Sequence, residues 1–330
     1  MKLYFAGMES ITNSYEDYTF EDTDNVFGTY FYEGNTTKML LKLRHHGKHK
    51  GIITVDSGAH SFFGFAGVSS ATHHKSSKKE DMPDPNEYIM QYLAWLKKYG
   101  HLLDYFVELD IQAIVGIEKV RYWRKKIERE GLWHKCIPVL HSCDTEAQWD
   151  ETIKGAASGY VGLEGLRAGK VTLPYMKLLE KCYNLGVKVH GFALTNYKIL
   201  EQFPFWSADS TTWTSCVRYG TFIVRDEFGK MMQKNPSTEN YLSHGISLDI
   251  HKNKRSKESS TKKLEHSAQK FRESEKFLTR LWAERGVDWD KKLGGSGSIQ
   301  NGDGRLELQK GPGRPRRGRA HGETEREHKA

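Results

Sequence analysis

The chain has 330 residues, a formal net charge of +8 and a hydrophobic content of 37%. This length suits one barrel-sized domain with an appendage, and no apolar stretch approaches the roughly 18 residues that a transmembrane helix needs. The four cysteines form no C-x-x-C pair, which argues against a structural zinc site and a disulfide framework. We therefore expect a protein without membrane association in a reducing, cytoplasmic setting, which is the host cytoplasm if a phage encodes it.

Apolar runs and amphipathic segments alternate from the N-terminus onwards. The apolar runs predict eight strands, the second of them weak, at residues 1–7, 27–32, 52–56, 105–110, 137–140, 160–163, 187–192 and 205–209. The segments between them predict helices at residues 38–46, 85–99, 120–130, 145–157, 173–183 and 196–202. Such alternation indicates a parallel sheet. The expected fold class is α/β, a (β/α)8 TIM-like barrel over residues 1–250.

The remaining chain predicts a basic helical and disordered C-terminal extension. Residues 251–293 form a charged helical part, in which a helix over 261–285 has apolar positions that would pack against the barrel. Residues 294–330 open with a Gly/Ser run and have the composition of a flexible tail. A long polar segment at 64–84, which contains His73 and His74, is expected on the catalytic face of the barrel.

The excess positive charge lies entirely in this extension. From Lys252 to Ala330 there are 21 basic and 12 acidic residues, a balance of +9, whereas the first 251 residues carry a balance of −1. A near-neutral body with a basic tail is suited to binding a polyanion. A tail that only keeps the protein in solution is the alternative.

Three aspartates each close an apolar run. Asp56, Asp110 and Asp209 are the last residues of the predicted strands at 52–56, 105–110 and 205–209. In a parallel barrel the carboxyl ends of the strands meet at one face, where catalytic residues are found. Each Asp could instead cap the helix that follows it. Three acids in equivalent positions favour a site that binds a polar ring and stabilises positive charge.

Motifs around these positions resemble the tRNA-guanine transglycosylase superfamily. They are Val55-Asp56-Ser57-Gly58-Ala59-His60, Leu109-Asp110, Val139-Leu140-His141, Gly165-Leu166-Arg167-Ala168-Gly169, and His190-Gly191-Phe192-Ala193-Leu194-Thr195 followed by Asp209. The cysteine-rich zinc site of the tRNA enzymes is missing, and Lys170 stands where bacterial members commonly have Glu. The pattern is more similar to the phage and bacterial branch that replaces guanine in DNA with 7-deazaguanine derivatives.

The resemblance implies a role for each matching residue. Asp209 would be the nucleophile at C1′, Asp56 the general acid and base, and Asp110 the acceptor for the guanine edge. The pocket would be completed by Ser57, Gly58, His60, His141, Gly165 and Leu166. Alternatives remain open: His141 as a core histidine, Gly165 as a turn, His60 as a surface residue and Asp209 as a helix cap.

The tail contains a segment that resembles an AT-hook, at residues 310–319. A Gly-Arg-Pro core flanked by basic residues suits the narrow minor groove of A·T-rich DNA. The DNA contacts would come from Lys310, Arg314, Arg316, Arg317 and Arg319. Short Arg/Pro/Gly runs also arise in disordered tails without this role.

We therefore expect a pentosyltransferase, a DNA-guanine transglycosylase that exchanges guanine for a 7-deazaguanine derivative in double- or single-stranded DNA. The co-substrate is the 7-deazaguanine base, and neither a cofactor nor a metal is expected. The alternatives are a tRNA-guanine transglycosylase, a non-catalytic DNA-binding or DNA-protecting module on the same barrel, and a glycosidase that leaves an abasic site. A homodimer or a partner protein is left open.

Overall fold

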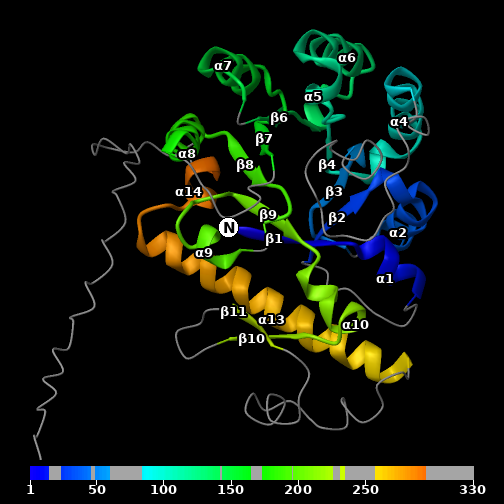
Figure 1. Ribbon diagram of the computed structural model, residues 1–330, viewed down its shortest axis with the longest axis vertical. Coiled ribbons are helices and arrows are strands. Elements are labelled where there is room, and N and C mark those ends of the chain that lie inside the picture. Colours follow the sequence, from blue (N-terminus) through cyan, green and yellow to red (C-terminus); the bar gives the residue numbers. More distant parts are fainter. Residues whose placement is uncertain are drawn as a thin grey trace, which may run out of the picture.

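The computed structural model describes residues 1–14, 24–45, 49–59, 84–141, 143–164, 173–194, 196–225, 231–234 and 257–294. Nine short strands form a parallel sheet that curves into a nearly closed barrel (Figure 1), hydrogen-bonded in the order β5-β4-β3-β2-β1-β9-β8-β7-β6. The strands are β1 (Lys2–Ala6), β2 (Asn25–Thr29), β3 (Ile53–Asp56), β4 (Tyr105–Val107), β5 (Cys136–Ile137), β6 (Val139–Leu140), β7 (Tyr160–Leu163), β8 (Lys188–Gly191) and β9 (Ser207–Ser210).

The two ends of the sheet meet at Pro138. Because proline has no N–H to donate, the predicted strand at 137–140 is divided into β5, which pairs with β4, and β6, which pairs with β7. The Pro138 carbonyl still accepts a hydrogen bond from the Gly162 N–H at 2.8 Å. The Glu108 carboxylate accepts the Val139 N–H at 2.6 Å. β5 and β6 thus share one place in the ring, which is compatible with a TIM-like barrel of eight parallel strands.

Helices follow the strands in the alternating order that the sequence predicts, and several surround the barrel (Figure 1). They are α1 (Met8–Ser14), α2 (Glu33–His45), α4 (Pro85–Tyr99), α5 (Gln112–Val115), α6 (Ile117–Arg129), α7 (Glu146–Gly155), α8 (Leu173–Leu185), α9 (Tyr197–Leu200) and α10 (Ser215–Arg218). Thr145 caps the start of α7, because its hydroxyl accepts the Gln148 N–H and the Gln148 side chain accepts the Thr145 N–H.

Three undivided strands differ from the predicted bounds by two residues or more at one end. The strand at 27–32 lies at Asn25–Thr29, because the Thr29 hydroxyl accepts the Phe31 N–H and starts a 3-10 turn, η1 (Tyr30–Tyr32). Asp110 was expected to close a strand, but β4 ends at Val107 and Asp110 lies three residues beyond it. Asp209 lies inside β9, which begins only at Ser207.

The predicted helix over 261–285 is α13 (Lys257–Glu284), followed by α14 (Trp289–Gly294), and it packs against the barrel (Figure 1). The Phe271 ring lies 4.8 Å from the Phe5 ring of β1. The Arg272 guanidinium donates two hydrogen bonds, of 2.8 and 2.7 Å, to the Asp24 carboxylate. Beside α13 lies an antiparallel hairpin that was not predicted, formed by β10 (Phe222–Arg225) and β11 (Met231–Lys234). The predicted boundary at residue 250 and the tail beyond residue 294 fall outside the described residues.

None of the helices described here combines the length and the apolar character needed to cross a membrane. In the same part of the chain, all four cysteines are free thiols, and Cys143 is the exposed one.

Candidate active site

The three predicted aspartates lie at the same face of the barrel. Asp56 is the last residue of β3, Asp209 is the third of four residues in β9, and Asp110 follows β4. The strands are parallel, so their carboxyl ends share one face. Asp56 is half-buried, and the charges of Asp209 and Asp110 both act on its carboxyl group. The structure therefore brings together the three acids that the sequence singled out.

Burial raises the pKa of Asp56 to about 7. The nearby carboxylates of Asp209 and Asp110 add to the rise, while the Gly58 N–H, which donates to Oδ2 at 3.0 Å, opposes it. A carboxyl group with such a pKa holds a proton about half of the time at neutral pH. It can therefore both give and take a proton during a reaction.

The Ser57-Gly58 segment packs tightly behind Asp56. The Ser57 carbonyl accepts the Tyr88 hydroxyl proton at 2.6 Å. Gly58 has φ +78, and a Cβ at this position would lie 2.8 Å from the backbone nitrogen of Phe31, so the conformation and the close approach both require glycine. The buried Ser57 hydroxyl has no hydrogen-bond partner in the described part of the chain.

Asp209 is held through one of its two carboxylate oxygens. It is 7% exposed, and Oδ1 accepts the Ala193 N–H at 2.7 Å and lies 3.2 Å from His190 Nε2. No described residue makes a hydrogen bond to Oδ2. Ala193 has φ 50, a left-handed conformation that is costly for a residue other than glycine. This backbone turn aims the N–H at Asp209.

Two of the three acids do not cap the helix that follows them, and the third makes only a local hydrogen bond. Thr211 and Ile111 occupy the cap positions of η6 (Thr212–Thr214) and α5, so neither Asp209 nor Asp110 caps the next helix. Asp56 does make a local bond of the Asx type to the Gly58 N–H.

His141 lies between Asp110 and Asp144. Its Nε2 is 2.5 Å from Asp110 Oδ1, and its Nδ1 is 3.6 Å from Asp144 Oδ2. Burial alone would lower the pKa of His141, but the hydrogen bond to Asp110 and the charges of the two carboxylates outweigh it and raise the pKa to about 11. His141 is therefore a cation at neutral pH and orients Asp110. It is buried, as a core histidine would be, yet it touches the acid cluster.

Glu9 is a fourth acid near this face, and the sequence analysis missed it. It lies three residues beyond β1, as Asp110 lies three residues beyond β4, and it is 3% exposed. Burial raises the pKa of Glu9 to about 7, the Arg218 cation opposes the rise, and the Asp56 carboxylate adds to it. Glu9 could have been identified from the sequence as an acidic residue that lies shortly after the end of a predicted strand.

Several predicted residues lie outside the described residues. These are His60, Gly165, Leu166 and the tail residues Lys310, Arg314, Arg316, Arg317 and Arg319, together with Lys170, His73 and His74.

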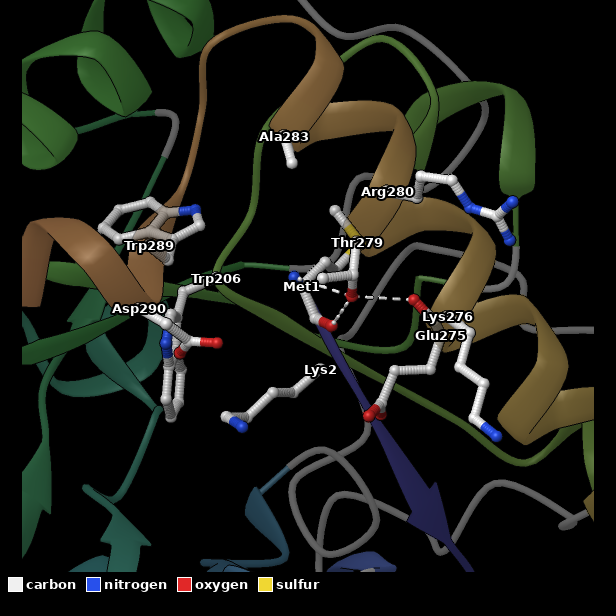
Figure 2. A pocket seen from close by; sticks show the side chains of 10 residues that line it. All are labelled: Met1, Lys2, Trp206, Glu275, Lys276, Thr279, Arg280, Ala283, Trp289 and Asp290. Atoms are coloured by element: carbon white, nitrogen blue, oxygen red, sulfur yellow. Dashed lines mark hydrogen bonds between the residues drawn. The ribbon is translucent and has the colours of Figure 1, made fainter.

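A cavity of about 400 Å³ lies at the opposite end of the barrel, beside the start of β1 (Figure 2). Trp206, Trp289 and Asp290 line one side of it, and Glu275 and Arg280 of α13 line the other. This cavity contains none of the three aspartates. The candidate site is therefore defined by the acid cluster and not by this cavity.

Among the residues that the structure places, no three His, Cys, Asp or Glu side chains are grouped as metal ligands would be. No family model and no curated protein matches this chain. The acid cluster itself is thus the observation from which a function has to be argued.

Proposed function

We propose that this chain is a DNA-guanine transglycosylase, which replaces guanine in DNA with a 7-deazaguanine derivative through a covalent intermediate on Asp209. The observation that carries the proposal is a division of roles between two neighbouring acids. Asp209 is oriented through Oδ1 by two contacts, and Asp56 has a pKa of about 7. A fixed carboxylate beside a carboxyl group that exchanges protons near neutrality suits cleavage and re-formation of a glycosidic bond.

In the first half-reaction, Asp209 Oδ2 attacks C1′ of the target nucleotide. A bond forms between Oδ2 and C1′, the bond from C1′ to N9 breaks, and the bonding electrons leave with guanine. Asp56 in its protonated form gives a proton to the departing base. The products are free guanine, an ionised Asp56 and a sugar that is esterified to Asp209.

In the second half-reaction, the 7-deazaguanine base takes the place of guanine. The ionised Asp56 removes the proton from the ring nitrogen of the incoming base, and that nitrogen attacks C1′. The ester bond breaks and returns its electrons to Asp209. Both acids regain their initial states, so the cycle needs no oxidant, reductant or metal.

Asp110 is suited to hold either base. A carboxylate can accept hydrogen bonds from the N1–H and the exocyclic amine of guanine, which the 7-deaza compounds share. His141 orients the Asp110 carboxyl group through its 2.5 Å contact. Ser57 offers a buried hydroxyl group at the same edge of the site.

The choice of DNA rests on sequence features. The segment at 310–319 resembles an AT-hook, the basic excess lies in the C-terminal extension, and a zinc site of the kind found in the tRNA enzymes is missing. Extrusion of a base from duplex DNA costs a few kcal/mol and less from a single strand. We therefore expect faster exchange in single-stranded or mismatched DNA.

Nucleoside mass spectrometry tests the proposal and its alternatives together. DNA and, separately, tRNA are incubated with the protein and 7-cyano-7-deazaguanine, digested, and analysed for the 7-deaza nucleoside. Its appearance in DNA supports the proposal. Its appearance in tRNA alone would show that the protein exchanges the base in tRNA and not in DNA. Abasic sites without the new nucleoside would indicate a glycosidase. An unchanged nucleoside composition in both DNA and tRNA would contradict base exchange.

A further inference from the structure

His190 connects the predicted nucleophile to two hydroxyl groups inside the barrel. His190 lies on β8, is fully buried, and has Nε2 3.2 Å from Asp209 Oδ1. On the other side of the ring, Nδ1 is 2.7 Å from the Ser207 hydroxyl and 3.1 Å from the Tyr160 hydroxyl. The Ser207 and Tyr160 hydroxyls also bond to each other. All of these groups are buried among the strands β7, β8 and β9.

We propose that His190 is a positioning residue, which holds Asp209 Oδ1 through an Nε2–H tautomer fixed by Ser207 and Tyr160, and thereby leaves Oδ2 as the atom that attacks C1′. The effect of His190 on base exchange rests on the proposed function, but the tautomer of His190 can be measured independently of any activity. We call Tyr160, Ser207 and His190 the hydroxyl–imidazole chain.

The direction of the protons follows from the groups at the two ends of the chain. An ionised Asp209 has no proton to give, so His190 Nε2 must be the donor in their contact. A neutral imidazole then needs a donor at Nδ1, which the Ser207 hydroxyl supplies, and Tyr160 donates in turn to Ser207. The carboxylate at the Asp209 end of the ring therefore sets the direction of the protons in this chain.

The surroundings of the ring keep His190 in place. The Phe27 ring is stacked on it at 5.0 Å with an interplanar angle of 11°. Tyr4 and Phe192 lie at 5.4 and 4.9 Å between ring centroids. Among the described side chains that hydrogen-bond to the His190 ring or stack on it, Asp209 is the one carboxylate, while the others present aromatic rings or hydroxyl groups. The imidazole therefore has little freedom except the choice of tautomer.

The first test is the effect of two His190 variants on base exchange. His190→Phe keeps an aromatic ring against Phe27 but has no N–H, so we expect kcat to fall roughly 10- to 100-fold, the loss expected for one hydrogen bond to a charged group. KM for DNA should stay unchanged, because His190 does not touch the nucleic acid. His190→Gln places an amide donor near the Nε2 position and should restore part of the rate.

The second test is a matched pair of tyrosine variants. Tyr160→Phe removes a hydroxyl of the chain, whereas Tyr105→Phe removes one that bonds to Lys188 at the other end of the barrel. The two rings pack against each other at 5.1 Å, so the substitutions disturb the same region of the core. We expect a lower kcat for Tyr160→Phe alone. Equal effects of the two variants, or full activity of His190→Phe, would overturn the positioning role.

The third measurement does not depend on activity. The 15N chemical shifts of the His190 ring identify which nitrogen carries the proton, and we expect Nε2–H in the wild type and a mixture of tautomers in Ser207→Ala. An Nε2–H signal in a protein that exchanges no base would refute the proposed function and leave the tautomer assignment standing. An Nδ1–H signal in the wild type would refute the inference, whatever the activity.

Discussion

His141 Nε2 lies 2.5 Å from Asp110 Oδ1, and Nδ1 of the same ring lies 3.6 Å from Asp144 Oδ2. The Gln112 amide donates to the other oxygen of Asp144 at 2.6 Å, and the Trp149 indole donates to the His141 carbonyl at 2.9 Å. The ring is therefore held by its contact with Asp110 beside the Asp144 carboxylate, the Trp149 bond holds the His141 backbone, and the ring orients Asp110 in turn. Under the proposed function, this arrangement orients the carboxylate that recognises the base.

His141→Gln tests this arrangement through stability. Gln keeps a donor for Asp110 but removes the charge, so the free energy of unfolding should fall by about 1–3 kcal/mol at pH 6. The pKa of His141 is raised to about 11, so its contribution is complete below the unfolded-state value near 6.5 and is lost as the pH rises towards 11. Urea unfolding at pH 6, 8 and 10 should therefore show a shrinking difference. The exposed His134 provides a control, His134→Gln, and a difference independent of pH would contradict the account.

Asp56→Asn should separate activity from stability. The pKa of Asp56 is raised to about 7, so the folded protein binds a proton more tightly than the unfolded chain, and stability falls as the pH rises from about 4 to about 7. The variant should be more stable than the wild type at pH 8, by at most about 4 kcal/mol, and similar to it at pH 4. Base exchange should be lost at every pH. A variant less stable than the wild type at pH 8 would show that the ionised Asp56 does not destabilise the folded protein.

Glu9→Gln should move the pH dependence of the reaction. The Asp56 carboxylate adds to the raised pKa of Glu9, and because the interaction between two acids is mutual, a charge on Glu9 should also disfavour the ionised form of Asp56. Removal of the Glu9 charge should therefore shift the limb of the pH–rate profile that reports Asp56 to lower pH. The maximum rate should change little, because Glu9 has no role in the proposed steps. An unmoved limb would mean that Glu9 does not influence the reacting acid.

Deletion of residues 294–330 should weaken DNA binding and flatten its salt dependence. Each lost contact with a phosphate lowers the slope of log K against log salt by about 0.9. Fluorescence anisotropy over a series of salt concentrations measures this slope. Deletion of residues 320–330 alone leaves the segment at 310–319 in place and serves as the control. Equal slopes for the wild type and the longer deletion would show that residues 294–330 make no contacts with DNA phosphates.

The strand-end acids could be predicted because they follow a simple pattern. A buried parallel strand is almost continuously apolar, so a carboxylate directly after it marks the edge of the core. This pattern located Asp56 and Asp110, and it located Asp209 although β9 begins only two residues earlier. Glu9 lies as far beyond its strand as Asp110 does, but it escaped because Gly7 ends the apolar run before it and because it stands in the first turn of α1, where an acidic residue is ordinary.

The hydroxyl–imidazole chain could not be predicted from the sequence. Tyr160, Ser207 and His190 come from three strands, and their contacts depend on the register, which pairs His190 with Ser207 across β8 and β9. The division of one strand at Pro138 and the hairpin of β10 and β11 were missed for a related reason. The hairpin depends on which strand is available as a hydrogen-bond partner, and the missing N–H of Pro138 divides a strand only because different neighbours pair with its two halves.

The most direct measurement is the release of guanine from radiolabelled DNA, with and without 7-cyano-7-deazaguanine, by the wild type and by Asp209→Asn. We expect that sustained release requires the incoming base and falls at least about 1,000-fold in the variant, which should keep its fold and its affinity for DNA. Sustained release at a near-wild-type rate by Asp209→Asn would contradict the central claim that this carboxylate carries the sugar.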